Sequence, residues 1–132
     1  MSVSEIFKVC RTVAVVGASP NPDRASHRVF NYLCEHGFKA IPVNPTATEV
    51  SGLVCYPNLS AVPEKIDCVD VFRRSEDVLP IVEEAIKIGA KAIWLQEGIV
   101  NGEAEAKALA AGLLIVQDRC IMKEHRRLAY EG

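Results

Sequence analysis

The sequence predicts a doubly wound α/β domain, in which five mainly parallel strands form one sheet with helices on both faces. Short apolar runs alternate along the chain with segments of helical periodicity, as in βαβ units. The first apolar run, 12–17, is stopped by a glycine and followed by a polar loop with two prolines, as at the first turn of a Rossmann-like sheet. The 132 residues suffice for a single domain, 1–132, with its own core.

The first half of the chain is expected to form two of these strands and the helix that joins them. Its elements, in order, are a short helix at 3–10, a strand at 12–17, a helix at 26–36, a strand at 39–43, an extended piece at 53–56 and a helical turn at 59–62. The residues of the first strand are mostly apolar up to Gly17, which allows a sharp turn. The helix that follows places Val29, Tyr32 and Leu33 on one face, and Gly37 is its predicted stop.

The second half is expected to repeat the strand–helix pattern. Its elements are a strand at 68–72, a helix at 75–88, a strand at 92–95, a helix at 103–111, a strand at 114–116 and a final helix at 120–128. Ser75 is the predicted N-cap of the first of these helices, and Gly89 and Gly112 follow the first two as stops. Right-handed crossovers favour the strand order 3-2-1-4-5, with the ligand near the switch point between strands one and four.

Composition and charge narrow the class of protein. The 15 basic and 17 acidic residues are mixed along the chain and leave a net charge of −2, which argues against nucleic acid and membrane-surface partners. The chain has no apolar run of bilayer length and no signal-peptide core near Glu5 and Lys8, so we expect a cytoplasmic protein. The five cysteines and three histidines are scattered without ligand spacing, so reduced thiols and no metal site are expected.

The loop after the first strand is the first part of the candidate ligand site. It reads G-A-S-P-N-P-D-R from Gly17, which is neither a G-x-G-x-x-G fingerprint nor a P-loop. Backbone groups of Gly17-Ala18-Ser19, the Ser19 hydroxyl, Arg24 and Ser26 are candidate phosphate contacts at a helix N-terminus.

The remaining candidates follow the other strands. The second strand ends at Val43-Asn44 without the acid that usually binds the ribose of NAD, so NAD is disfavoured, and ligands with a ribose phosphate, such as NADP or coenzyme A (CoA), remain open. Phe72 and Arg73 follow the third strand. Gln96 and Gly98 follow the fourth.

Several motifs together resemble the small stand-alone CoA-binding domain family, akin to the CoA-binding domain of the succinyl-CoA synthetase α subunit. They are V-A-V-V-G-A-S-P-N-P-D-R at 13–24, P-V-N-P at 42–45, I-D-C-V-D-V-F-R at 66–73, E-A-I-K-I-G-A-K-A-I-W-L-Q-E-G-I at 84–99 and D-R-C-I-M-K-E-H-R-R-L at 118–128. The resemblance implies a CoA diphosphate over Gly17-Ala18-Ser19 and adenosine near Val43, Asn44, Phe72 and Arg73. It also implies that the pantetheine runs toward Gln96 and Gly98. The synthetase's domain with the phosphorylated histidine is absent, so acyl-CoA synthesis is not carried over.

The leading hypothesis is therefore a non-catalytic module that binds CoA or an acyl-CoA as carrier, sensor or regulator. The alternatives are an NADP-type or other nucleotide-dependent enzyme and an interaction domain with a vestigial pocket. No catalytic residue is predicted, since Cys120 and His125 lie off a shared helical face. A mixed disulfide between the CoA thiol and Cys55 or Cys120 stays open, as do the oligomeric state and any protein partner.

Overall fold

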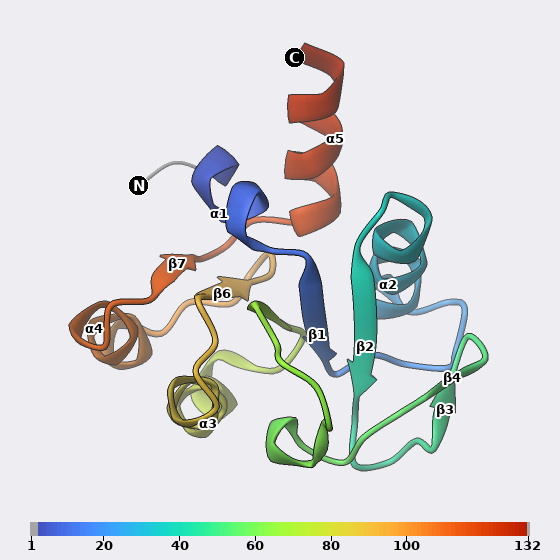
Figure 1. Ribbon diagram of the computed structural model, residues 1–132, viewed down its shortest axis with the longest axis horizontal. Helices are drawn as coiled ribbons and strands as arrows, with labels where there is room; N and C mark the ends of the chain where they lie inside the picture. Colours follow the sequence, from blue (N-terminus) through green and yellow to red (C-terminus); the bar gives the residue numbers. More distant parts are fainter. Residues whose placement is uncertain (1–2, 132) are drawn as a thin grey trace.

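A computed structural model describes residues 3–131 of the chain, with side chains to residue 129 (Figure 1). The elements are α1 Val3–Val9, β1 Thr12–Val16, α2 Ala25–Glu35, β2 Lys39–Val43, β3 Glu49–Val50, β4 Leu53–Val54, the 3₁₀ turn η1 Leu59–Ala61, β5 Cys68–Val71, the 3₁₀ turn η2 Ser75–Asp77, α3 Val78–Lys87, β6 Ala92–Leu95, α4 Gly102–Ala110, β7 Leu114–Val116 and α5 Ile121–Glu131. Strands β1, β2, β5, β6 and β7 form one parallel sheet. The predicted fold class is confirmed.

The predicted strand order is wrong. The sheet runs β2-β1-β5-β6-β7, so the third long strand lies beside the first and not beyond the second. Both orders satisfy the right-handed crossover rule, which therefore does not decide between them. Pro42 decides between the two orders. Its carbonyl accepts the Tyr56 N–H at 3.0 Å on the side of β2 that faces away from β1. A further long strand on that side would need a backbone N–H from this position, which proline lacks. The switch point consequently lies between β1 and β5.

Helices cover both faces of the sheet, as predicted. Apolar side chains of α1, α2 and α5 pack on one face around the fully buried Trp94 and Phe30. On the other face, α3, α4 and η1 pack against residues such as Val69 and Val71. In Figure 1, α3 and α4 lie side by side at the lower left and α2 lies at the right. The two faces account for nearly all of the buried apolar side chains.

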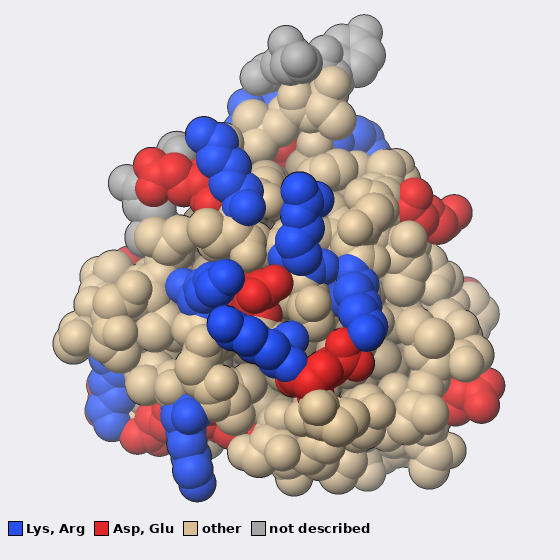
Figure 2. Space-filling view, in the orientation of Figure 1, with Lys and Arg blue, Asp and Glu red and all other residues tan. Residues whose placement is uncertain are grey.

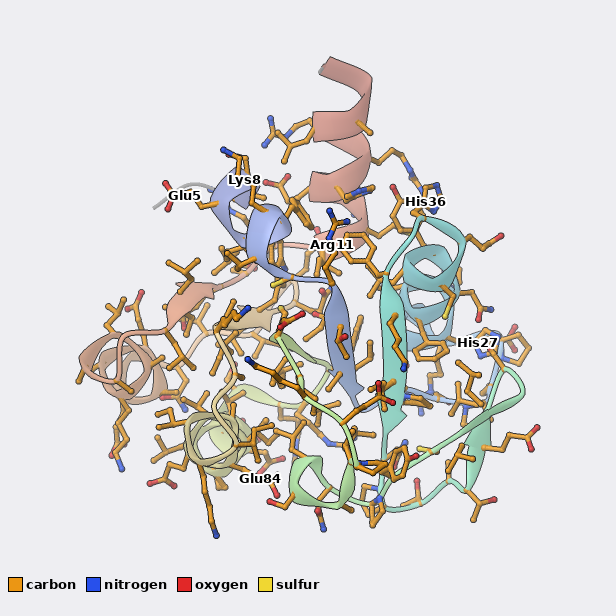
Figure 3. All side chains as sticks on the ribbon, in the orientation of Figure 1. Glu5, Lys8, Arg11, His27, His36 and Glu84 are labelled. Atoms are coloured by element: carbon orange, nitrogen blue, oxygen red, sulfur yellow. The ribbon has the colours of Figure 1, made fainter. Side chains whose placement is uncertain are left out.

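One predicted helix cap is wrong. Ser75 lies in η2, before α3, and its hydroxyl accepts the Val100 N–H at 3.1 Å, so it ties the two loops at the carboxyl ends of β5 and β6 together. The N-cap of α3 is Asp77, whose side chain makes no capping bond. Another long-range tie is Glu84 of α3, labelled in Figure 3, which accepts backbone N–H groups of η1. Side chains thus fix loops that the strand–helix pattern leaves undefined.

The amino ends of the strands are held by charged side chains paired within the protein. The Asp67 carboxylate accepts the N–H groups of Arg11 and Thr12 at 3.1 and 3.0 Å, and Lys91 Nζ lies 3.5 Å from it. Partial burial acts to raise the pKa of Asp67, but these N–H donors and Lys91 outweigh it and lower that pKa. Figure 3 labels Arg11 at the start of β1, and Figure 2 shows basic side chains beside acidic ones at the centre of this view.

No helix within residues 3–131 is both long and apolar enough to cross a membrane.

Candidate functional site

A cavity of about 1170 Å³ opens at the carboxyl ends of the strands, between the N-termini of α2 and α5. Eight of the residues proposed from the sequence line it: Gly17, Ser19, Arg24, Ser26, Asn44, Phe72, Arg73 and Gln96. The chain brings them together because parallel strands end at one edge of the sheet. The cavity is large enough for a nucleotide-sized ligand with a long side arm.

Gly17 forms part of the cavity wall where β1 and β5 approach each other. Its φ of +94° is in the region that favours glycine, and a Cβ at this position would lie 2.2 Å from the Phe72 carbonyl oxygen. Its N–H donates to Val43 O at 2.8 Å, so the residue joins the ends of three strands. A side chain at this position would separate β1 from β5 and fill the space above the switch point.

The loop after β1 is held open by local hydrogen bonds. The Ser19 hydroxyl accepts the Asn21 N–H at 3.1 Å, and His27 Nδ1 lies 2.8 Å from the Ser19 carbonyl. Figure 3 labels His27 beside this loop. The residue before α2, Arg24, makes no side-chain capping bond, so the N–H groups of Ala25 and Ser26 stay available to an anion, whereas that of His27 donates to Arg24 O at 3.1 Å.

Three of the proposed residues do not line the cavity. Ala18 and Val43 are buried in the cores of opposite faces of the sheet. Gly98 is exposed, and its N–H donates to the Asp118 carboxylate at 2.7 Å. Asn44 does reach the cavity, but its amide donates to Ala18 O at 2.8 Å, so it also fixes the loop from behind. Position at a strand end therefore does not by itself bring a side chain to the cavity.

Four lining residues have polar groups that no other described residue satisfies. The Ser26 hydroxyl and the Gln96 Nε2 have no hydrogen-bond partner within the described part of the chain, although these residues are only 6% and 4% exposed. Arg24 and Arg73 make no ion pair with a described carboxylate. Arg24 is exposed and Arg73 half-buried, so both cations, like the free groups of Ser26 and Gln96, are open to the cavity and fit a polar anionic ligand.

The charge of the cavity favours an anion. Its lining holds five cationic side chains and two carboxylates, Asp77 and Glu97. Both carboxylates are already paired: Asp77 lies 3.1 Å from Arg74 Nε, and Glu97 lies 3.1 Å from Lys123 Nζ. The lining cations beyond these pairs are Arg24, Arg28 and Arg73, of which Arg28 donates to the Asp23 carbonyl at 3.2 Å.

The sequence analysis missed part of the lining. The additional residues with polar or sulfur-containing side chains include Arg28, Thr46, Arg74, Cys120, Met122 and Lys123. Arg28 had a usable signal, because it stands four residues after Arg24 on the predicted helix. The sequence suggests Cys120 as a candidate partner of the CoA thiol but not as part of the lining, to which a hydrogen bond from Ile121 N–H to Gln96 Oε1 and the packing of α5 beside α2 bring it.

The side chains that could suggest catalysis are engaged elsewhere. Glu124 pairs with Arg119 and Arg127, and His125 Nδ1 lies 2.9 Å from the Tyr32 hydroxyl. Burial, together with the nearby His36, lowers the pKa of His125. Within residues 3–131, no group of three His, Cys, Asp or Glu side chains is placed to hold a metal ion.

Comparisons with known proteins identify the family to which the chain belongs. A model of the CoA binding domain matches residues 11–126. The uncharacterized protein YneT of Bacillus subtilis (strain 168) is 38% identical over 123 residues, which are 93% of this chain and 91% of that protein. A hypothetical protein from Pyrococcus horikoshii OT3 has a solved structure with a TM-score of 0.93 and 44% identity, covering 98% of this chain and 93% of that one.

Longer enzymes contain a similar segment. The chain is 28% identical over 107 residues to an ADP-forming acetate–CoA ligase II of Archaeoglobus fulgidus, a match that covers 75% of this chain. The match covers only 16% of the ligase, so the chain corresponds to one part of that enzyme. With the family model matching most of its length, the chain belongs to the CoA-binding domain family.

Proposed function

We propose that the chain binds CoA or an acyl-CoA in the cavity at the carboxyl ends of the strands, without catalysing a reaction on it. The observation that carries the proposal is the pair of arginines, Arg24 and Arg73, which line the cavity without a carboxylate partner among the described residues. CoA bears a diphosphate and a 3′-phosphate, which are ligands that arginine binds through charge-assisted bidentate hydrogen bonds.

Each part of CoA has a matching part of the cavity. The uncapped N-terminus of α2, with Ser19, Arg24 and Ser26, is proposed to hold the diphosphate. Phe72 offers its ring to the adenine, and Arg73 its charge to the 3′-phosphate. The pantetheine is proposed to extend past Gln96, whose unpaired Nε2 suits an amide carbonyl.

A non-catalytic role is supported by the side chains around the cavity. The imidazole that stands nearest in sequence to the cavity thiol, His125, bonds to Tyr32 and is not part of the cavity lining. His27 is close to the phosphate loop, but its Nδ1 bonds to the Ser19 carbonyl. Neither histidine is placed as a base for a cavity nucleophile. The module is proposed to act in the cytoplasm as a carrier, a sensor or a regulatory partner.

Calorimetric titration of the purified protein with CoA tests the proposal, with dephospho-CoA, NADP and NAD as comparison ligands. We expect saturable binding of CoA that weakens at least roughly tenfold without the 3′-phosphate, since a lost charge-assisted bond costs about 1.5–3 kcal/mol. Binding of NADP with no response to CoA would replace this proposal with a nucleotide-dependent enzyme. A flat response to all four ligands would indicate an interaction domain with a vestigial pocket.

A further inference from the structure

One wall of the cavity carries a thiol that simple CoA binding does not require. Cys120 lines the cavity and immediately precedes α5. Its carbonyl accepts the Glu124 N–H at 3.0 Å, so the residue stands at the N-cap position of this helix. It is 6% exposed, and Met122 lines the cavity beside it. The thiol of Cys120 can therefore contact a ligand that binds in the cavity.

Gln96 provides independent evidence that a ligand comes close to this thiol. Its Oε1 accepts the N–H of Ile121, the residue next to Cys120, at 3.2 Å. Its Nε2 has no hydrogen-bond partner in the described part of the chain, although the residue is 4% exposed and lines the same cavity. Since this donor is not among the buried atoms without a partner, it opens onto the cavity, where an acceptor of a bound ligand can reach it.

The two sides of the cavity differ in chemistry. On the side of α2 and the end of β5 stand the unpaired cations Arg24 and Arg73. On the side of α5, beyond Gln96, stand the thiol of Cys120 and the thioether of Met122. A CoA molecule whose phosphates occupy the first side extends its thiol arm past Gln96 toward the second. The anionic part of CoA therefore fits the cationic side of the cavity, and its thiol arm fits the side that holds Cys120.

We infer that Cys120 forms a mixed disulfide with CoA bound in this cavity, an inference that rests on the proposed function. The co-reactant is a CoA disulfide, which exchanges with the protein thiol. The Cys120 thiol gives up its proton, and its Sγ attacks one sulfur of the disulfide. The new Sγ–S bond forms as the old S–S bond breaks, and the departing CoA thiolate takes up a proton. The exchange consumes no further oxidant or reductant.

The other cysteines separate ligand-directed exchange from general thiol reactivity. Cys55 does not line the cavity, and its thiol donates to Asn44 O at 3.6 Å. Cys34 is exposed on α2 and also lies outside the cavity lining. Cys34 is therefore the thiol that a reagent without affinity for the cavity reaches most easily, and it is the matched control.

The test treats the reduced protein with CoA disulfide or with hydroxyethyl disulfide and follows the adducts by intact mass and peptide mapping. Comparing two reagents on the same two thiols cancels the intrinsic reactivity of each thiol. We expect CoA disulfide to raise the ratio of Cys120 to Cys34 adduct roughly tenfold or more over the small reagent, because binding places the reacting sulfurs together. Excess 3′-phosphoadenosine 5′-diphosphate should slow the Cys120 reaction, and dithiothreitol should reverse it.

Variants and titration keep the outcomes distinct. The Cys34→Ser variant should still take up one CoA, and the Cys120→Ser variant should lose the cavity adduct. An equal adduct ratio with both reagents, in a protein that binds CoA by calorimetry, would overturn the inference and leave the proposed function standing. A protein that neither binds CoA nor reacts selectively would overturn both.

Discussion

At the amino ends of the strands, the Asp67 carboxylate accepts two backbone N–H groups and lies 3.5 Å from Lys91 Nζ. At the carboxyl ends of the same strands, Arg24 and Arg73 have no carboxylate partner among the described residues. These two arginines remain without a carboxylate although the carboxyl ends also hold two ion pairs, Arg74 with Asp77 and Lys123 with Glu97. The paired groups at the amino ends therefore contribute to folding stability, and the two unpaired arginines at the carboxyl ends are left for a ligand.

Asp70 lies between the two ends and belongs to neither pattern. It is fully buried in β5, beside Val15 and Trp94 on the neighbouring strands, and neither of its carboxyl oxygens has a hydrogen-bond partner in the part of the chain that the structure describes. Burial raises the pKa of Asp70 well above its usual range. An unpaired buried group of this kind lowers the folding stability, whereas the paired Asp67, just before the same strand, increases it.

The largest effect is expected at the carboxyl ends, where Gly17 lies against the end of β5. The Gly17→Ala substitution should lower the free energy of unfolding by about 3 kcal/mol or more, because the new Cβ meets the Phe72 carbonyl. Urea denaturation measures the change. The matched control is Gly98→Ala, where φ is also positive, at +81°, but nothing lies within 4 Å, so about 1 kcal/mol is expected. Equal losses would mean that backbone conformation, and not the contact, fixes this glycine.

The next effect concerns the unpaired carboxyl. Folded Asp70 holds its proton above the usual value of 3.8, so the folded state binds more protons than the unfolded one. The stability of the natural protein should then fall as pH rises above about 4, at up to about 1.4 kcal/mol per pH unit, until the raised pKa is reached. Asp70→Asn removes this titration and should gain on the order of 2 kcal/mol at pH 7 relative to the natural protein. A gain that stays constant from pH 4 to pH 8 in urea denaturation would contradict the assignment.

The unpaired arginines test the other half of the comparison. Arg24→Ala and Arg73→Ala should each weaken CoA binding roughly tenfold in calorimetry, with the free energy of unfolding changed by less than about 0.5 kcal/mol. Lys39→Ala is the control at the amino ends, where this lysine pairs with Glu64. It should leave CoA binding unchanged. If Lys39→Ala weakened binding as much as either arginine variant, total charge and not position would determine affinity.

The sequence predicted the fold class and the edge of the sheet that holds the cavity, because apolar runs and their stops are local. The predicted strand order was wrong, since the order depends on which neighbours satisfy each backbone edge. Pro42 carried that information, but only as a constraint on β2. The thiol wall at Cys120 depends on the packing of α5 against α2, a long-range contact without a local pattern. The unpaired state of Asp70 likewise emerges only when its neighbours are known.

The smallest effect is expected at Asp67, and its sign is opposite to that of Asp70. Because its pKa is lowered in the folded state, Asp67 stabilises the fold at pH values above the usual 3.8, and this stability is lost as pH falls through the lowered pKa. Asp67→Asn keeps an oxygen that can accept from Thr12 but removes the attraction to Lys91, so about 1 kcal/mol should be lost at pH 7. The loss should shrink below pH 4, while CoA affinity stays unchanged. The free energy of unfolding of each variant, relative to the natural protein, should therefore change with pH in opposite directions. As pH rises, it should rise for Asp70→Asn and fall for Asp67→Asn, if Asp67 is paired and Asp70 is not. A CoA affinity that dropped in Asp67→Asn would show instead that the two ends of the sheet are coupled through β5.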